Sequence, residues 1–202
     1  MSVQPPYPAG NPILFTPQIN SQTVGATPNY ANVNDAYEAT TVAGYPFPNG
    51  AFNPPGLAFY WSDPNGRPIV LKYVRYNPTA HVALSASNVP GVVYWKDETK
   101  TVVTPTFSES VLDVTGCEAG ILLNASVTDG NWTIIQCEGF LASCNVPAST
   151  AKGDALIGGA ATALVLARVA AGTAPTSQVV AWSWGAVSGG LADVNLVLPY
   201  TG

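Results

Sequence analysis

The distribution of proline divides this chain into two parts that must fold differently. Ten of the 18 prolines lie in the first 56 of its 202 residues, in segments such as PPYP, YPFP and NPPG. Proline cannot donate a backbone hydrogen bond, and it biases the preceding residue towards an extended conformation. We therefore expect residues 1–56 to form a long extended arm, with room for one short helix around residues 33–40.

This predicted arm is apolar. The first 66 residues contain neither lysine nor arginine. Ordering about 50 residues costs on the order of 75 kcal/mol, which burial of about 3,000 Å² of apolar surface would offset. The rest of the chain is small for that task, so we expect the arm to lie mainly on neighbouring polypeptides. The contact residues predicted in the arm are Ile13, Leu14, Phe15, Tyr30, Tyr45, Phe47 and Phe52.

The next part of the chain, residues 57–147, has the turn signals and apolar runs of a β-rich body. Three hairpins are predicted, around the Asp-Pro-Asn-Gly turn at 63–66, the charged loop at 96–100 and the Asp-Gly turn at 128–131. Their strands are expected at 57–61 and 68–76, at 91–95 and 101–107, and at 121–127 and 132–137. Residues 108–114 fit either one helical turn or a strand.

Residues 148–202 are predicted to complete the body with further strands. After a turn at Gly153-Asp154 and the short segment ALIGG, alternating patterns cover 162–170, 179–186 and 191–198. A helix over 160–171 is the alternative, but the segment lacks an N-cap and is rich in β-branched residues. The predicted fold class is therefore all-β. We expect a small barrel or sandwich of antiparallel strands, preceded by the extended arm.

The charge of the chain excludes several classes of partner. Only 9% of the residues are charged, and the net charge is −5 with 7 basic residues. No basic cluster is available to neutralise phosphates, so nucleic acid is not an expected partner. No run approaches the ~18 apolar residues that span a bilayer, and the N-terminus lacks the regions of a signal peptide. We therefore expect no membrane partner and synthesis in a cytoplasm.

Residues that could carry chemistry are few. Cys117, Cys137 and Cys144 are an odd number with unpaired spacing, which indicates buried thiols rather than a metal site. His81 is the only histidine, and no nucleophile motif surrounds it. Most of the acidic residues lie in predicted turns, where aspartate serves the backbone. The sequence thus predicts no catalytic residue, no metal and no cofactor, and the chain is not expected to be an enzyme.

The five tryptophans allow two interpretations. Trp is enriched in cores and at subunit interfaces, and this is the favoured role. Exposed tryptophans could instead stack on sugars, as in an adhesin that binds a host surface. The residues concerned are Trp61, Trp95, Trp132, Trp182 and Trp184.

The second half of the chain resembles head decoration (cement) proteins of tailed bacteriophages. The similarity lies in a G-x-W-x-x-I-Q-x-x-G strand pair, a GD turn and a VVA…V ending, over residues 120–202; residues 57–119 match only in character. The matching positions are Gly130, Trp132, Ile135, Gln136, Gly139, Gly153, Asp154, Val180, Ala181 and Val194.

This resemblance implies a β-rich, non-enzymatic virion protein on the exterior of a capsid. The implied partners are the major capsid protein and further copies of the chain, in a trimer or another cyclic homo-oligomer. The arm would clamp the shell or link neighbouring decoration subunits. The rival hypotheses are a head fibre or glycan-binding adhesin, a capsid or tail-tube subunit, and, with least support, a hydrolase.

Overall fold

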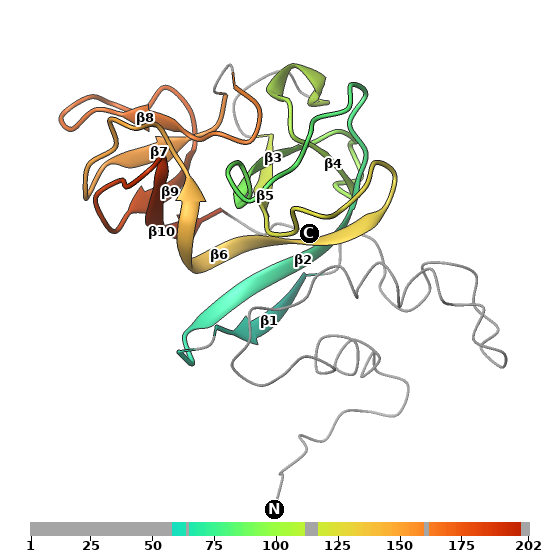
Figure 1. The fold of residues 1–202 in the computed structure, drawn as a ribbon, viewed down its shortest axis with the longest axis horizontal. Coiled ribbons are helices and arrows are strands. Elements are labelled where there is room, and N and C mark those ends of the chain that lie inside the picture. The colour runs from blue at the N-terminus through green and yellow to red at the C-terminus, as the bar shows by residue number, and fades with distance from the viewer. Residues whose placement is uncertain (1–57, 64, 112–116, 160–161, 199–202) are drawn as a thin grey trace, which may run out of the picture.

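The computed structural model describes residues 58–63, 65–111, 117–159 and 162–198, which carry the β-structure (Figure 1). The predicted arm and its seven contact residues lie outside these ranges. Within them the chain is all-β, as predicted, with ten strands and one turn of 3-10 helix at Phe107–Glu109.

The ten strands belong to one hydrogen-bonded sheet. In chain order they are β1 (Ala58–Ser62), β2 (Pro68–Tyr76), β3 (Gly91–Trp95), β4 (Val102–Thr104), β5 (Glu118–Leu122), β6 (Trp132–Asn145), β7 (Ala155–Ile157), β8 (Ala167–Val169), β9 (Val179–Ser183) and β10 (Leu191–Val197).

Five of the strands close into a ring. Their order is β2-β4-β3-β5-β6, and β6 also pairs with β2, with Lys72 opposite Ile135. The pairing of β2 with β4 is parallel, which corrects the expectation of antiparallel strands throughout. The reason is the connection: the chain crosses from β2 to β3 through residues 77–90. The β3–β4 hairpin then turns β4 back beside β2.

The remaining strands extend the sheet on the other side of β6. The order continues as β6-β10-β9-β7-β8. Figure 1 shows the long β6 passing beneath the ring and then bending upward into this second part of the sheet. Its early residues pair with β2 as far as Glu138, and its later residues pair with β10.

Two large apolar cores lie in the described part of the chain, beside a small cluster of Ala155, Ile157 and Val169 on β7 and β8. The ring encloses one core, which includes Val74, Val93 and Leu122. The second core lies on the other side of β3 and β5, between these strands and β6, β9 and β10. It includes Ile121 and Leu196. The strands β3, β5 and β6 contribute side chains to both cores, so the two parts of the sheet are packed together through these strands.

Several predicted elements are confirmed. The first two hairpins form at the predicted turns, since β1 pairs with β2 and β3 with β4 in antiparallel register. Strands β7 and β9 fall inside the predicted segments. In β10 the alternation holds as predicted, with Ala192, Val194, Leu196 and Leu198 buried.

Several predicted strands were too long. The strand expected at 101–107 is reduced to β4, and the pattern at 179–186 gives a strand only as far as Ser183. The strand expected at 121–127 ends at Leu122, because the Asn124 side chain accepts a hydrogen bond from the Ser126 N–H and turns the chain. The strand expected at 162–170 is reduced to β8. Leu164 adopts a positive φ of 66° and inserts its fully buried side chain into the core of the ring. Residues 107–109 form the helical turn that the sequence left open against a strand.

Candidate interaction surface

The most conspicuous surface feature is an apolar face on β9 and β10, which we call the tryptophan face. It consists of Trp182 (45% exposed), Trp184 (62%) and Val197 (39%). Trp182 and Trp184 are two residues apart on one side of the chain, with the buried Ser183 between them. Val197 points outward from the neighbouring strand β10, whose alternate residues are buried.

A bulge in β9 places these indoles outside. Leu156 of β7 is paired with Ala181, and Ile157 with Val179, so Val180 is the extra residue. Val180 and Ala181 are consecutive and both fully buried. The bulge therefore shifts the alternation and directs Trp182 to the outer face.

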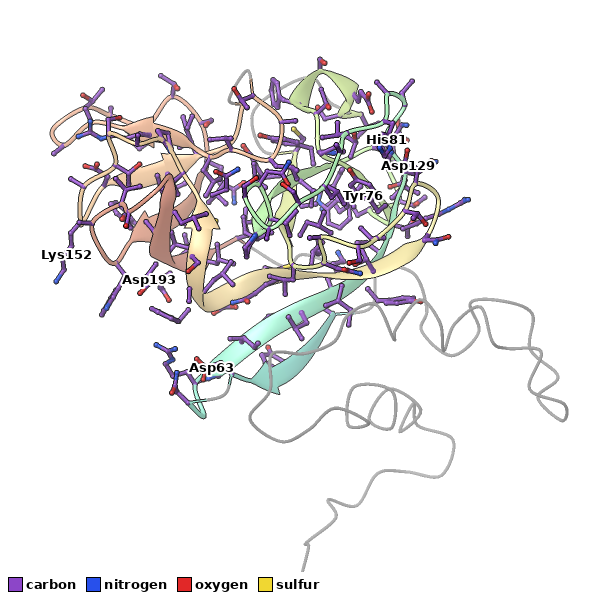
Figure 2. All side chains as sticks on the ribbon, in the orientation of Figure 1. Asp63, Tyr76, His81, Asp129, Lys152 and Asp193 are labelled. Carbon is purple, nitrogen blue, oxygen red and sulfur yellow. The ribbon has the colours of Figure 1, made fainter. Side chains whose placement is uncertain are left out.

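Polar groups border the tryptophan face. Asn195 is directly opposite Trp182 in the β9–β10 register. The Trp184 N–H donates to the Asp193 carbonyl at 2.7 Å, and the Gly153 N–H donates to the Ser183 carbonyl at 2.8 Å. Asp193 and Lys152 therefore flank the strand end that carries Trp184, and both are labelled on this side of the molecule in Figure 2.

The loop beside the tryptophan face is fixed by an ion pair. Asp154 is 3% exposed, and its Oδ2 accepts from the Ala151 N–H at 2.7 Å and from Arg168 Nε at 2.6 Å. The backbone hydrogen bond from Ala151, followed by Arg168, lowers the pKa of this carboxyl group. Asp154 thus ties the 151–154 turn to β8.

A second group of polar residues lies at the far end of the ring (Figure 2). His81 Nδ1 and Asp129 Oδ2 are 2.8 Å apart and connect the 77–90 crossover to the loop before β6. The His81 side chain is 71% exposed, so the pair lies on open surface.

The neighbouring carboxylate, Glu109, holds the start of the crossover. It accepts hydrogen bonds from the Thr79 and Ala80 N–H groups and from the Thr104 hydroxyl, and Lys96 Nζ lies 3.9 Å away. Burial of Glu109 raises its pKa, but these donors outweigh that effect and the pKa is lowered overall. The arrangement is that of a structural clamp on a long connection.

One lysine lies inside the ring. Lys72 is 2% exposed, and its Nζ lies 4.5 Å from the ring centroid of Trp95. Burial lowers the pKa of Lys72. Trp95 is itself buried, which confirms a core role for this tryptophan. Trp182 and Trp184 are exposed, so of the two predicted roles, core or subunit interface, only the interface role is left open for them.

The three cysteines are buried thiols, as predicted. Burial raises the pKa of the Cys137 and Cys144 thiols to about 12. A thiol with such a pKa is almost entirely protonated at neutral pH, and reactivity requires the thiolate. These side chains therefore act as small apolar groups of the core.

The seven predicted arm contacts fall outside the described residues. The tryptophan face was missed as a distinct surface. Its sequence signal was present, since Trp182 and Trp184 alternate with small residues. The bulge that determines which residues of β9 point outward cannot be recognised from the alternation of apolar residues in the sequence.

Comparisons with protein-family models, with curated proteins and with solved structures found no match. In the described part of the chain, no three His, Cys, Asp or Glu side chains are grouped to hold a metal ion. No helix within those same residues has the length and apolarity to cross a membrane.

Proposed function

We propose that this chain is a capsid decoration protein, which binds the outer surface of a major capsid protein and stabilises the head. It would act as a trimer or another cyclic homo-oligomer on the exterior of the virion, without a cofactor and without catalytic activity. The single observation that carries the proposal is a surface one: two tryptophans of a charge-poor chain are exposed two residues apart, in β9 and just after it.

The physical argument is about solubility and association. Monomeric proteins seldom leave neighbouring large aromatic side chains in water, whereas interfaces are enriched in tryptophan and depleted of charge. A decoration protein must bind a folded surface at many equivalent positions. An apolar arm and an aromatic face supply the area for such binding without a deep pocket.

The positions that resemble decoration proteins support the same proposal. Gly130, Gly139 and Gly153 all have positive φ angles, between 86° and 93°. Asp154 holds the turn after Gly153, and Val180 and Val194 are fully buried. The shared pattern therefore falls on residues that define backbone geometry and core, which is what a resemblance in fold requires.

The proposal predicts that residues 1–56 are needed for binding to bare heads. The test is a sedimentation assay of purified chain with undecorated heads, comparing the full chain with a chain that lacks residues 1–56. Because truncation could disturb folding, the second variant changes only Ile13, Leu14 and Phe15 to serine in the full chain. Both variants should lose binding while keeping the β-sheet circular dichroism signal.

The matched control for the triple variant replaces three exposed polar residues of the described body, Ser85, Ser87 and Glu98, with alanine. This control should bind as the unchanged chain does. Undiminished occupancy after truncation, or after the triple serine substitution, would refute the role of the arm. Failure of the unchanged chain to bind any head would refute the decoration function.

A second candidate function is a head-fibre or adhesin protein that binds host-surface glycans. It is favoured by the tryptophan face, where polar Asn195 and Asp193 border exposed indoles that could stack on sugar rings. A glycan array separates the two candidates. Binding by the isolated chain that disappears in Trp182→Ala/Trp184→Ala would support the adhesin.

A further inference from the structure

The spacing of the two exposed indoles specifies what kind of segment could cover them. Trp182 and Trp184 are alternate residues at the end of β9, so their attachment points lie about 6.8 Å apart. An extended peptide laid along β9 would present its own alternate side chains at nearly the same interval. Proline rings suit this position, because they are apolar and lose no side-chain rotamer freedom when they pack.

The chain itself contains such a segment. In Tyr45-Pro46-Phe47-Pro48 each aromatic residue precedes a proline, and residues before proline favour extended geometry. The alternation then puts Pro46 and Pro48 on one side and the two aromatic rings on the other. Two prolines two residues apart match two tryptophans two residues apart.

The sheet places the tryptophan face within reach of this segment. The described chain begins at Ala58 on β1, and β1 is connected to β9 through β2, β6 and β10. The register runs from Tyr60 to Val70, to Glu138 and to Val197, which is two residues from Asn195, the partner of Trp182. Four strand steps span about 19 Å, and the offset of about four residues between Ala58 and Trp182 brings the distance to about 23 Å. The ten residues from Pro48 to Ala58 can extend to about 33 Å.

We propose that the tryptophan face binds Tyr45–Pro48 of the same chain, with Pro46 and Pro48 packed on the indoles of Trp182 and Trp184. Tyr45 and Phe47 then point away from the body, where they remain free to meet a partner. The face of β9 and β10 becomes the side of the molecule that presents the root of the arm. This inference concerns the isolated chain and does not require the proposed capsid role. With the indoles covered by the chain's own segment, the capsid role would rest on the arm contacts rather than on direct binding by the tryptophan face.

The tether favours this segment over its nearest rival. Pro6-Tyr7-Pro8 has the same proline spacing but is separated from Ala58 by 50 residues rather than ten. Effective concentration falls roughly as the −3/2 power of linker length, so the distant segment is at a disadvantage of about tenfold. The same short tether favours the chain's own segment over that of a second copy.

The experiment uses the full chain labelled with 5-fluorotryptophan. The resonances of Trp182 and Trp184 are assigned with Trp182→Phe and Trp184→Phe, and their exposure is read from the fluorine shift between H₂O and D₂O. In the unchanged chain both resonances should be protected. In Pro46→Ser/Pro48→Ser both should gain about half of the full solvent shift, in line with their exposed fractions of 45% and 62%.

The matched control is Pro6→Ser/Pro8→Ser, which removes the same motif elsewhere in the arm. It should leave both resonances protected, and the buried Trp95 should be unaffected in every variant. The proposal is overturned if the two tryptophans are already exposed in the unchanged chain. It is equally overturned if they stay protected in the Pro46/Pro48 variant.

A mixing experiment identifies the donor of the segment. Unlabelled unchanged chain is added to the labelled Pro46→Ser/Pro48→Ser variant. If protection returns, or if protection in the unchanged chain depends on concentration, the occupant is a second copy and the proposal fails. Because no head is present, failure here leaves the sedimentation test of the capsid role unaffected, and failure in that test leaves this one unaffected.

Discussion

Gly153 and Gly139 have almost the same positive φ, but only Gly139 lies in close contact with another part of the backbone. Comparing them distinguishes the cost of the left-handed conformation from the cost of the contact. Gly153 has a φ of +86°, and a Cβ built there would meet nothing within 4 Å. Gly139 has a φ of +93°, and its Cβ would lie 2.6 Å from the Pro68 carbonyl oxygen. Gly139 thus lets β6 change partner from β2 to β10 in direct contact with the β2 backbone.

Alanine at these positions should therefore have unequal effects. Gly153→Ala is expected to lower the free energy of unfolding by about 1 kcal/mol, the cost of the left-handed conformation alone. Gly139→Ala adds a backbone clash and should cost about 3–5 kcal/mol. Urea unfolding of both variants measures the difference. Equal losses would show that the contact at Gly139 relaxes freely.

The lowered pKa of Asp154 predicts that the stability of the fold depends on pH in the acidic range. Its pKa is lowered from the usual 3.8 by the Ala151 N–H and by Arg168. A carboxyl group with a depressed pKa stabilises the fold fully above its unfolded pKa, and that stabilisation is lost as the pH falls through the folded pKa. Asp154→Asn should therefore cost about 2 kcal/mol at pH 7. The cost should shrink as the pH falls below about 4.

The measurement is the urea midpoint of the unchanged chain and of Asp154→Asn at pH 7, 5, 4 and 3. The two stability curves should converge at the acid end, since the unchanged chain then loses the charge that the variant lacks. Curves that stay parallel down to pH 3 would mean that Asp154 does not stabilise the fold through its charge.

At the scale of elements, the β3–β4 hairpin depends on one carboxylate. Asp97 Oδ1 accepts from the Thr101 and Val102 N–H groups at 2.9 and 2.8 Å, and Oδ2 accepts from the Thr101 hydroxyl at 2.6 Å. The charged loop that the sequence indicated as a hairpin tip is therefore fixed by its first acid. The next acid, Glu98, is exposed.

This contrast yields a paired prediction. Asp97→Ala should lower the free energy of unfolding by about 1–3 kcal/mol, because it leaves backbone donors of a tight turn without their acceptor. Glu98→Ala should change it by less than about 0.5 kcal/mol, as expected for an exposed side chain away from such contacts. Chemical denaturation of the two variants decides, and a larger loss in Glu98→Ala would contradict the assignment.

Local signals predicted the elements that turns and alternation determine. The Asp63 turn and the alternation of β10 could be read from the sequence because each depends on neighbours in the chain. The bulge at Val180 and the positive φ of Leu164 depend on how distant segments pack, so no local pattern reveals them. For that reason the all-β class was predictable, while the parallel β2–β4 pair and the outward tryptophans were not.

At the scale of the molecule, the two parts of the sheet are joined too closely to unfold independently. β6 contributes its early residues to the ring and its later residues to the second part, without interruption. Ile121 of β5 packs in the second core, while its neighbour Leu122 packs in the core of the ring. Opening either core exposes strands on which the other depends.

A matched pair of substitutions tests this coupling. Leu122 of the ring and Leu196 of the second core are both fully buried, so Leu122→Ala and Leu196→Ala should each cost about 2–5 kcal/mol. Each variant should shift one and the same transition, with tryptophan fluorescence and far-ultraviolet circular dichroism changing together. If Leu196→Ala split the transition in two, the second part of the sheet would be an independent unit. The proposed role also requires a single unit. A body that opened locally would not hold its tryptophan face in a fixed position relative to β1, the strand that follows the arm in the sequence.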